Sequence, residues 1–410
     1  MRDVAMIGER LRQARLASGM TLEEVVTQLG ALGQPLTKAG LSKYEMNKSQ
    51  PQATTLLKLG QVFGVRSAYF TEEPGAEVEW VAFRKQSHLP QGRQEHIKAY
   101  ATQVVEGQCW LQDVVYPDLR PDFPRQGRAQ TPDDAEGCAE HLRRAWELGE
   151  LPIESMSQTI EDHGGIVISW SEDEGKFDGL SGWANRSTPV MVFNRRVSTD
   201  RQRYNLAHEL GHMMLDSSDL PEQEHEGLAH RFAAAFLVPR RVARKELGEK
   251  RRHVDLNEFG LLKRKYGLSM QAWARRARDV EIIDEGYYKK LCVDFSSRGW
   301  RKQEPVLFQG DEEPTKLKQM TLHALAEGVI TRERASQLCP GGIEQPPRAA
   351  EADTERGLYL SAVELMRLPQ RERDRILAAA AVEAEAAYRT DRDLTDFEAF
   401  ADDDFFDETP

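Results

Sequence analysis

The spacing of hydrophobic residues changes from one part of this chain of 410 residues to another. Up to about residue 70, apolar residues recur every three or four positions in four short segments separated by turn residues, which predicts a bundle of helices. The apolar, β-branched runs 165–170 and 189–194 have the length of strands. Helical periodicity dominates at 204–214, at 226–239 and in most of 256–338. The pattern predicts a multidomain, mainly α chain that contains one α+β region.

Changes of pattern and composition suggest how the chain is divided. Between the bundle and the strands, residues 79–112 are largely helical in pattern, with Trp80 and Phe83 as apolar anchors. The basic loop 297–305 is interpreted as structural, with a phosphate contact as the alternative. The expected parts are an all-α bundle at 1–72, a helical connector at 73–131, an α+β domain with a helical extension at 132–300, a helical segment at 301–345, and a linker with an acidic tail at 346–410.

Charge is distributed unevenly along the chain. The net charge is -12, yet basic residues outnumber acidic ones up to residue 70, whereas residues 391–408 are acidic almost throughout. The two ends should therefore prefer different partners. We find no apolar run of about 20 residues and no signal peptide, so we expect a cytoplasmic protein without a membrane partner. The four cysteines are far apart and form no CxxC pair, which favours reduced thiols.

The third helical segment, residues 37–48, is the candidate for a DNA-recognition helix. Leu41 and Tyr44 are needed for the core of the bundle, and the remaining face mixes basic and amide side chains suited to phosphates and base edges. The alternative is a solvated basic face that binds nothing. The candidate DNA contacts are Lys38, Ser42, Lys43, Asn47 and Lys48.

A family resemblance favours the DNA-binding interpretation. The segments TLEEV (21–25), LSKYE (41–45) and PQATTLLKL (51–59) resemble the XRE family of helix-turn-helix repressors. The resemblance covers nearly all of the first seventy residues, although the turn at 29–36 is longer than the family pattern. It implies a helix-turn-helix fold that binds operator double-stranded DNA as a homodimer.

The motif HELGH at 208–212 carries the strongest chemical signal. His208 and His212 are four residues apart on a predicted helix, so their imidazoles lie one turn from each other and can hold one metal ion. Zinc suits two imidazoles and one carboxylate with a fourth position for water, whose pKa it lowers towards about 7. Glu209 is placed to take the proton of that water, which points to peptide hydrolysis.

A third ligand is expected from the helix predicted at 226–239. Glu226 shares a face with Ala229 and Ala233, and these small side chains would let the helix lie close to the HELGH helix. Spacing alone leaves other ligands open. His225 or His230 would help to hold an oxyanion, or would be surface or capping histidines. The competing side chains are Asp216, Glu222, Glu224, His225 and His230.

A second resemblance covers residues 132–240. The segments DGLSG (178–182), AHELGH (207–212) and EGLAHRFAAAFLVP (226–239) resemble the ImmA/IrrE family of metallopeptidases. The resemblance implies a zincin-like fold in which His208, His212 and Glu226 bind Zn²⁺ and Glu209 is catalytic. His230 stands where the family more often has asparagine. Because members cleave repressors, the expected substrate is a repressor-like protein or this chain itself.

Residues 178–182 separate the two predicted strands and are expected to form an exposed edge. An edge strand beside a metal site can hold an extended peptide by strand addition, which makes Leu180 and Ser181 candidate substrate contacts. The alternative is a glycine-bounded strand without such a role.

The acidic tail predicts a further partner. Its last residues intersperse Phe397, Phe400, Phe405 and Phe406 with carboxylates, so they lack a core but carry hydrophobic anchors for a basic partner. Residues 357–410 resemble the toxin-neutralising tails of small antitoxins, which implies a toxin partner. The alternative is a solubilising tail. A non-proteolytic antitoxin that represses its operator is therefore the competing function.

Overall fold

The computed structural model describes residues 2–85, 89–171, 177–217, 219–340 and 369–390. It divides into two compact units, 1–344 and 345–410. In the second unit, the structure describes helix α17 (Gln370–Thr390). The linker and the acidic end of the tail, including the residues expected to bind a toxin, otherwise lie outside the described residues.

The first seventy residues form the predicted helical bundle. Thr21 caps the second helix through a capping box with Glu24, and Gly64 ends the fourth helix in the left-handed conformation. The fully buried side chains of Leu11, Leu29 and Leu59 lie in its core. The elements are α1 (Arg2–Ala17), α2 (Leu22–Ala31), α3 (Lys38–Glu45), α4 (Ala53–Phe63) and the 3₁₀ helix η1 (Ser67–Phe70).

The middle of the chain contains a mixed four-stranded sheet. The predicted strands 165–170 and 189–194 are confirmed as β3 (Ile166–Trp170) and β5 (Thr188–Asn194), which pair in parallel. The strand order is β1-β4-β5-β3, and β4 (Phe177–Ala184) is antiparallel to both of its neighbours. A separate two-stranded ladder joins β2 (Gly127–Arg128) to β6 (Leu215–Asp216).

The helical interpretation of 79–112 is wrong for its first part. Residues Val78–Lys85 form strand β1, and helix α5 begins only at Gln91 and ends at Val115. β-Branched and aromatic residues favour strands. The decisive partner, however, is β4, about one hundred residues further along the chain. The sequence pattern of residues 79–112 could not reveal the strand, because its pairing partner lies outside that range.

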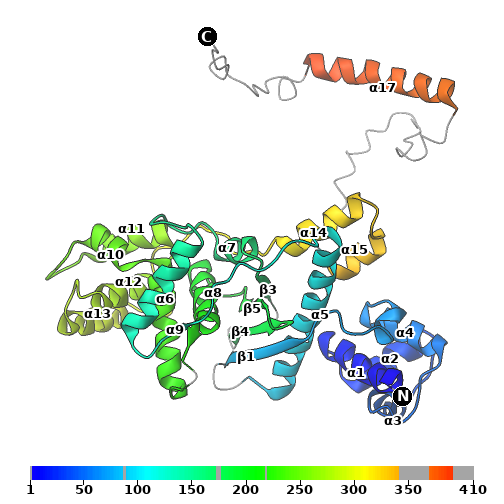
Figure 1. Cartoon of the computed structure of the whole chain (residues 1–410), viewed down its shortest axis with the longest axis horizontal. Helices are drawn as coiled ribbons and strands as arrows, with labels where there is room; N and C mark the ends of the chain where they lie inside the picture. The colour runs from blue at the N-terminus through cyan, green and yellow to red at the C-terminus, as the bar shows by residue number, and fades with distance from the viewer. Residues whose placement is uncertain (1, 86–88, 172–176, 218, 341–368, 391–410) are drawn as a thin grey trace. The chain divides into compact units, whose positions relative to one another are not determined.

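Helices cover both faces of the sheet (Figure 1). Side chains alternate along β5: Val190 and Val192 pack with α5, whereas Met191 and Phe193 belong to the core shared with α8 (Thr199–Met214). Helix α9 (Glu222–Leu237) packs against α8. The HELGH helix is therefore held between the sheet and a second helix, as a rigid support for chemistry.

Most of the remaining helices extend this core, and the last two before residue 340 pack against α5 in a separate cluster. Glu136 of α6 forms buried ion pairs with Arg276 of α12 and Arg231 of α9, so three helices meet at one carboxylate. The helices predicted within 256–291 and 312–338 are confirmed as separate shorter elements. The full set is α6 (Pro132–Ala145), α7 (Met156–Asp162), α10 (Arg240–Leu247), α11 (Leu256–Tyr266), α12 (Met270–Asp279), α13 (Glu285–Ser297), α14 (Lys316–Ala326) and α15 (Arg332–Leu338).

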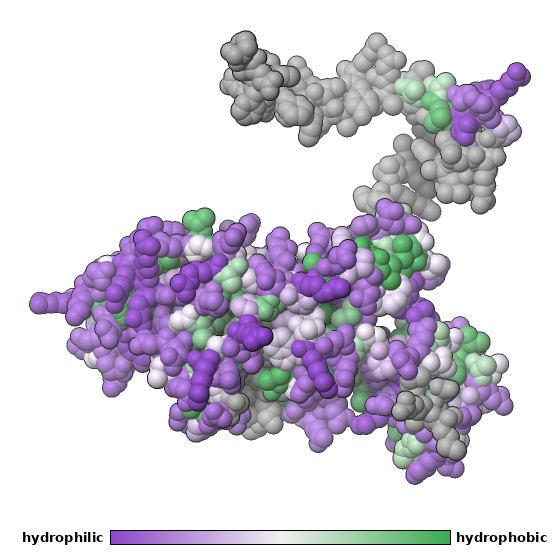
Figure 2. Space-filling model, viewed as in Figure 1, coloured by the Kyte–Doolittle hydropathy of each residue, from purple (hydrophilic) through white to green (hydrophobic). Residues whose placement is uncertain are grey.

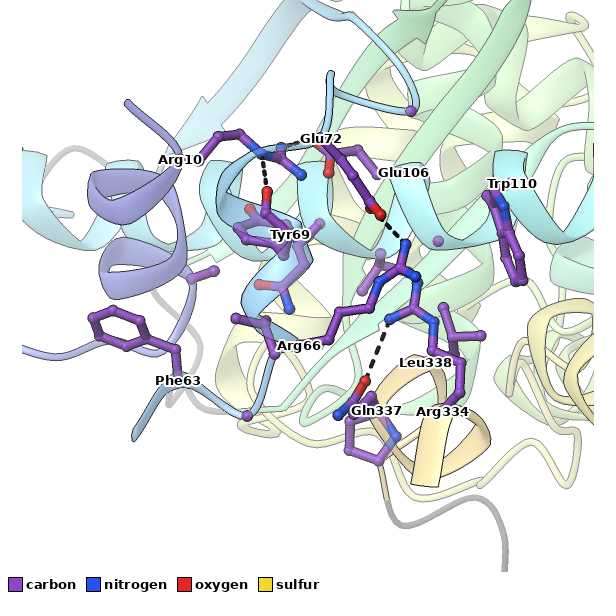
Figure 3. Close-up of a pocket in the computed structure, with 18 of the residues that line it drawn as sticks. Arg10, Phe63, Arg66, Tyr69, Glu72, Glu106, Trp110, Arg334, Gln337 and Leu338 are labelled. Carbon is purple, nitrogen blue, oxygen red and sulfur yellow. Dashed lines mark hydrogen bonds and ion pairs between the residues drawn. The ribbon is translucent and has the colours of Figure 1, made fainter. Parts of the chain in front are cut away.

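The N-terminal bundle contacts α5 through a buried ion pair. Arg10 Nη1 lies 2.6 Å from Glu106 Oε1, and both side chains are buried. Arg10 also donates to the carbonyl of Tyr69 and lies over the ring of that residue (Figure 3). Beside this contact, a cavity of about 540 Å³ is bounded by Arg66 of the bundle and Arg334 of α15.

The surface is mainly hydrophilic on the face shown in Figure 2, with a hydrophobic area over α14 and α15, where Leu322 and Val329 are exposed. Among the described helices, none combines the length and hydrophobicity needed to cross a bilayer. Cys109, Cys138, Cys292 and Cys339 are all free thiols, in agreement with the sequence-based expectation.

Candidate metal centre

Close packing of α8 on α9 brings the candidate ligands together. At Gly211 of α8, an added Cβ would lie 3.2 Å from the carbonyl oxygen of Ala229 and 3.2 Å from Phe232 Cδ1. A larger residue would push the helices apart, so glycine on one helix and alanine on the other allow the short separation. As a result, the side chain of Glu226 reaches the two histidines of α8.

His208, His212 and Glu226 form a triangle of residues in which Glu226 approaches each histidine with a different carboxylate oxygen. Nε2 of His208 lies 3.0 Å from Nε2 of His212. Glu226 places Oε2 3.3 Å from Nε2 of His208 and Oε1 3.3 Å from Nε2 of His212. Tetrahedral zinc ligands at about 2.0–2.1 Å from the ion are about 3.3 Å from each other. These three residues therefore fit a zinc ion.

The electrostatics of this triangle favour an ionised carboxylate. His208 and His212 are buried, and their hydrogen bonds hold the pKa of Glu226 well below its usual range. Glu226 remains about one-third exposed, so the triangle has one side open to solvent. An anionic ligand with one open position is the arrangement expected of a catalytic rather than a closed structural zinc site.

A chain of polar contacts orients His212. Its Nδ1 lies 2.8 Å from Nε2 of His225, and Nδ1 of His225 contacts Oγ of Ser217. In the tautomer that leaves Nε2 of His212 available to a metal, Nδ1–H donates to His225, and His225 donates to Ser217. Burial and the nearby His212 lower the pKa of His225, which favours its neutral form. His225 thus holds a ligand in place.

His230 is half-buried and lies beside His208. The centroids of the two rings are 4.3 Å apart, and donor atoms of His208, Glu226 and His230 lie within 4.8 Å of one another. Nδ1 of His230 lies 3.2 Å from the hydroxyl of Tyr204. A ring held this way has one nitrogen anchored by Tyr204 while the imidazole borders the metal centre.

Glu209 is fixed by β4. Its Oε2 accepts a 2.8 Å hydrogen bond from Oγ of Ser181, and both side chains are fully buried. Gly179 lies two residues earlier on the same face of the strand, where an added Cβ would come within 2.9 Å of Glu209 Cγ. Ser181 and Gly179 therefore define where the carboxylate of Glu209 can lie.

The expectation that 178–182 forms an exposed edge is wrong. β4 is hydrogen-bonded to β1 on one side and to β5 on the other, so it cannot pair with a peptide. Leu180 faces the α5 side and is fully buried there. Ser181 faces α8, but its hydroxyl is bound to Glu209. The error has a physical cause: the neighbour that covers β4 is β1, which the sequence pattern assigned to a helix.

Comparisons with known proteins agree with both halves of this description. Residues 11–70 match the helix-turn-helix family model, and residues 162–278 match the model of the IrrE N-terminal-like domain. The chain joins a helix-turn-helix domain to an IrrE-like peptidase domain. Both resemblances found in the sequence are thereby confirmed. The proposed antitoxin resemblance of the tail stays a prediction.

The helix-turn-helix part also has a relative. It is 31% identical over 74 residues to YonR, an uncharacterised HTH-type transcriptional regulator derived from the SPbeta prophage in Bacillus subtilis (strain 168). The match covers 18% of this chain and 64% of YonR, so the chain spans less than two thirds of that relative. The comparison supports a regulatory helix-turn-helix domain at this end of the chain.

The candidate DNA contacts of the helix-turn-helix domain lie on and just after α3. Lys43 and Lys48 are exposed, and Lys38 forms an ion pair of 3.3 Å with exposed Glu23. Asn47 has a positive φ of 54°, and its Oδ1 accepts a 2.9 Å hydrogen bond from the backbone of Gly8. That oxygen therefore supports the fold. Contacts to DNA from these residues and from half-buried Ser42 stay predictions.

The residues that orient the peptidase centre had weak sequence signals. Tyr204 and Ser217 were not singled out, and Ser181 was assigned a different role. Asp178 also escaped notice: it pairs with Arg201 at 2.7 Å, and its carbonyl accepts from Asn205 at 3.2 Å. Tyr204, Ser181 and Asp178 act through contacts of α8 with α9 or β4, and Ser217, just after β6, contacts α9. The useful signal was the two-residue alternation of β4, which places Gly179 and Ser181 on one face.

Proposed function

We propose that this helix-turn-helix protein is a transcriptional regulator whose IrrE-like domain is a zinc-dependent endopeptidase, acting on a regulatory protein or on another copy of this chain. The triangle formed by His208, His212 and Glu226 carries the proposal, because its sides of 3.0–3.3 Å match the separation of tetrahedral zinc ligands. The agreement of the family model at 162–278 supports it.

The side chains divide the work as follows. His208, His212 and Glu226 would hold zinc, which supplies Lewis acidity and lowers the pKa of water towards about 7. Glu209 accepts the proton of the attacking water on its carboxylate and delivers it to the leaving amine. Ser181 orients that carboxylate through its 2.8 Å hydrogen bond. His230 donates from its ring to the carbonyl oxygen of the scissile bond, where negative charge develops.

Replacing Glu209 tests the peptidase. The full-length protein and its Glu209→Gln variant are incubated with the proteins encoded by its neighbouring genes, and also alone at high concentration, and the products are identified by mass spectrometry. We expect fragments from the parent only, with equal zinc content in both proteins. The His208→Ala variant should lose zinc as well as activity. Equal processing by the parent and the Glu209→Gln variant would refute the peptidase.

The regulatory half is tested on DNA. We propose that the protein binds its operator as a homodimer through α3. Changing Lys43 and Asn47 to alanine should weaken retardation of the protein's own promoter region, with Lys43 contributing by its exposed charge. Because Asn47 also binds Gly8, the Lys43→Ala single variant is the cleaner comparison. Unchanged retardation would count against this face of α3.

A further inference from the structure

A second depression lies directly beside the metal centre. It has a volume of about 610 Å³, and His230 and Tyr204 form part of its wall. His230 thus borders the metal centre on one side and this depression on the other. The opposite wall comes from α12, from α13 and from the loop that follows α13. A polypeptide at the metal centre would extend into this space.

The loop at 300–304 is fixed in place by Glu304. Its carboxylate accepts hydrogen bonds from the backbone N–H groups of Met270 and Gln271, at 2.9 and 3.0 Å, where α12 begins. It also pairs with Lys263 at 2.9 Å. The carbonyl of Trp300 accepts from the side chain of Gln271 at 3.0 Å. The basic loop noticed in the sequence is therefore held in place by these contacts, which determine where its cations lie.

Those cations have no ion-pair partner among the residues that the structure describes. Arg301 and Lys302 of the loop and Arg275 of α12 are exposed, and none of the three forms an ion pair with another described residue. By contrast, Lys263 is balanced by Asp200 and Glu304, and Arg201 by Asp178. Five basic and two acidic side chains line the depression, in a chain whose net charge is -12. The local excess of positive charge is therefore opposite to that of the whole protein.

Aromatic rings accompany these charges. Tyr288 of α13 and Trp300 of the loop line the same depression and are only partly buried. Arg298 lies over the ring of Trp300, with its Cζ 5.1 Å from the centroid, which holds the indole in one orientation. Cations beside partly exposed rings are suited to a ligand that alternates carboxylates with apolar side chains.

We propose that this depression is a substrate subsite that binds an acidic segment of the protein to be cleaved, next to the scissile bond. The inference rests on the proposed peptidase and specifies its substrate class. An extended peptide that passes His230 on leaving the metal centre enters the depression that Arg275, Arg301 and Lys302 line. A nucleic acid is the less suited occupant, because the depression leads to the peptidase centre and is away from the helix-turn-helix domain.

Binding of a defined probe tests the subsite without requiring hydrolysis. The protein is the full-length Glu209→Gln variant loaded with zinc. The probe is a fluorescein-labelled twelve-residue peptide in which Asp and Glu alternate with Phe and Ala, followed by anisotropy at 0.15 M NaCl. The test variant adds Arg301→Glu and Lys302→Glu. Its matched control adds Lys250→Glu and Arg252→Glu, two exposed cations outside the depression.

We expect the substitutions at 301 and 302 to lower the affinity for the acidic peptide at least tenfold. The control substitutions at 250 and 252 should change that affinity less than twofold. Zinc content and circular dichroism should match the parent. The milder Arg275→Gln variant, which adds no charge, should weaken binding two- to threefold and guards against misfolding of the double variant. If both pairs of substitutions lower the peptide affinity equally, or if neither pair lowers it, the proposed subsite is wrong.

Two further measurements separate the alternatives. The affinity for a labelled 20-base-pair DNA duplex is measured in the same way. If the substitutions at 301 and 302 lower the affinity for the duplex more than the affinity for the peptide, the depression binds nucleic acid and the proposal is wrong. In the active protein, the same pair should raise KM for an acidic target with little change in kcat. Failure of the peptidase itself would instead appear as equal processing by the parent and Glu209→Gln, whatever the peptide affinity.

Discussion

Gly179→Ala is expected to inactivate the peptidase without disturbing its metal ligands. The new Cβ would lie 2.8 Å from Cδ and 2.9 Å from Cγ of Glu209, whereas carbon atoms in contact prefer about 3.5–4.0 Å. The carboxylate of Glu209 must therefore move by about 0.7 Å or more. The backbone at this position is ordinary, so alanine itself causes no strain there.

The magnitude follows from the geometry of catalysis. A misplacement of about 1 Å in a reacting group costs about 10²-fold in rate, or about 2.7 kcal/mol of transition-state stabilisation. We expect kcat/KM of Gly179→Ala to fall by that factor. His208, His212 and Glu226 lie on other elements, so zinc content should not change.

The assay compares cleavage rate and zinc content for the parent, Gly179→Ala and a control, Gly137→Ala. Gly137 lies in α6, where an added Cβ meets nothing within 4 Å. The control should keep full activity. Parental activity in Gly179→Ala would refute the placement of Glu209 against β4. A parallel loss of zinc would show that the strand supports the ligands rather than the base.

Three other outcomes test the surroundings of the site. His225→Ala removes the group that orients His212, so zinc affinity measured by chelator competition should fall about 10–100-fold; unchanged affinity would exclude that role. Glu136→Ala leaves the buried Arg276 without its carboxylate and should lower the free energy of unfolding by about 3–5 kcal/mol in urea titrations, and a loss under 1 kcal/mol would contradict it. Burial raises the pKa of Glu161 to about 7 from 4.5, so its contribution to stability is full below about pH 4.5 and is lost as pH rises through 7, by about 3 kcal/mol. Glu161→Gln should flatten this fall in urea titrations from pH 4.5 to 8, and an unchanged slope would argue against it.

Local periodicity predicted the parts of the site that lie within one element. His208 and His212 needed only helical spacing, and the small residues of α9 indicated a close neighbour for α8. The pairing of β1 with β4 was not predictable in this way, because it joins residues about one hundred positions apart. That missing neighbour led Ser181 to be assigned to substrate, although it binds Glu209.

The residues that orient the ligands show a second limit. His225 was recognised as a candidate, but its role depends on Nε2 lying 2.8 Å from Nδ1 of His212 and on Ser217, which follows β6. Neither contact has a sequence spacing that distinguishes it from a surface histidine beside a serine. Side-chain direction across two packed helices is set by their crossing, which only the fold provides.

The position of β1 has a consequence for synthesis. At about 5–20 residues per second, β1 leaves the ribosome roughly 5–20 s before its partner β4. The hydrophobic core of the helix-turn-helix domain comes from residues up to Phe70, so it can form during that interval. Each new chain should therefore present a folded helix-turn-helix domain before its peptidase-like domain can be completed.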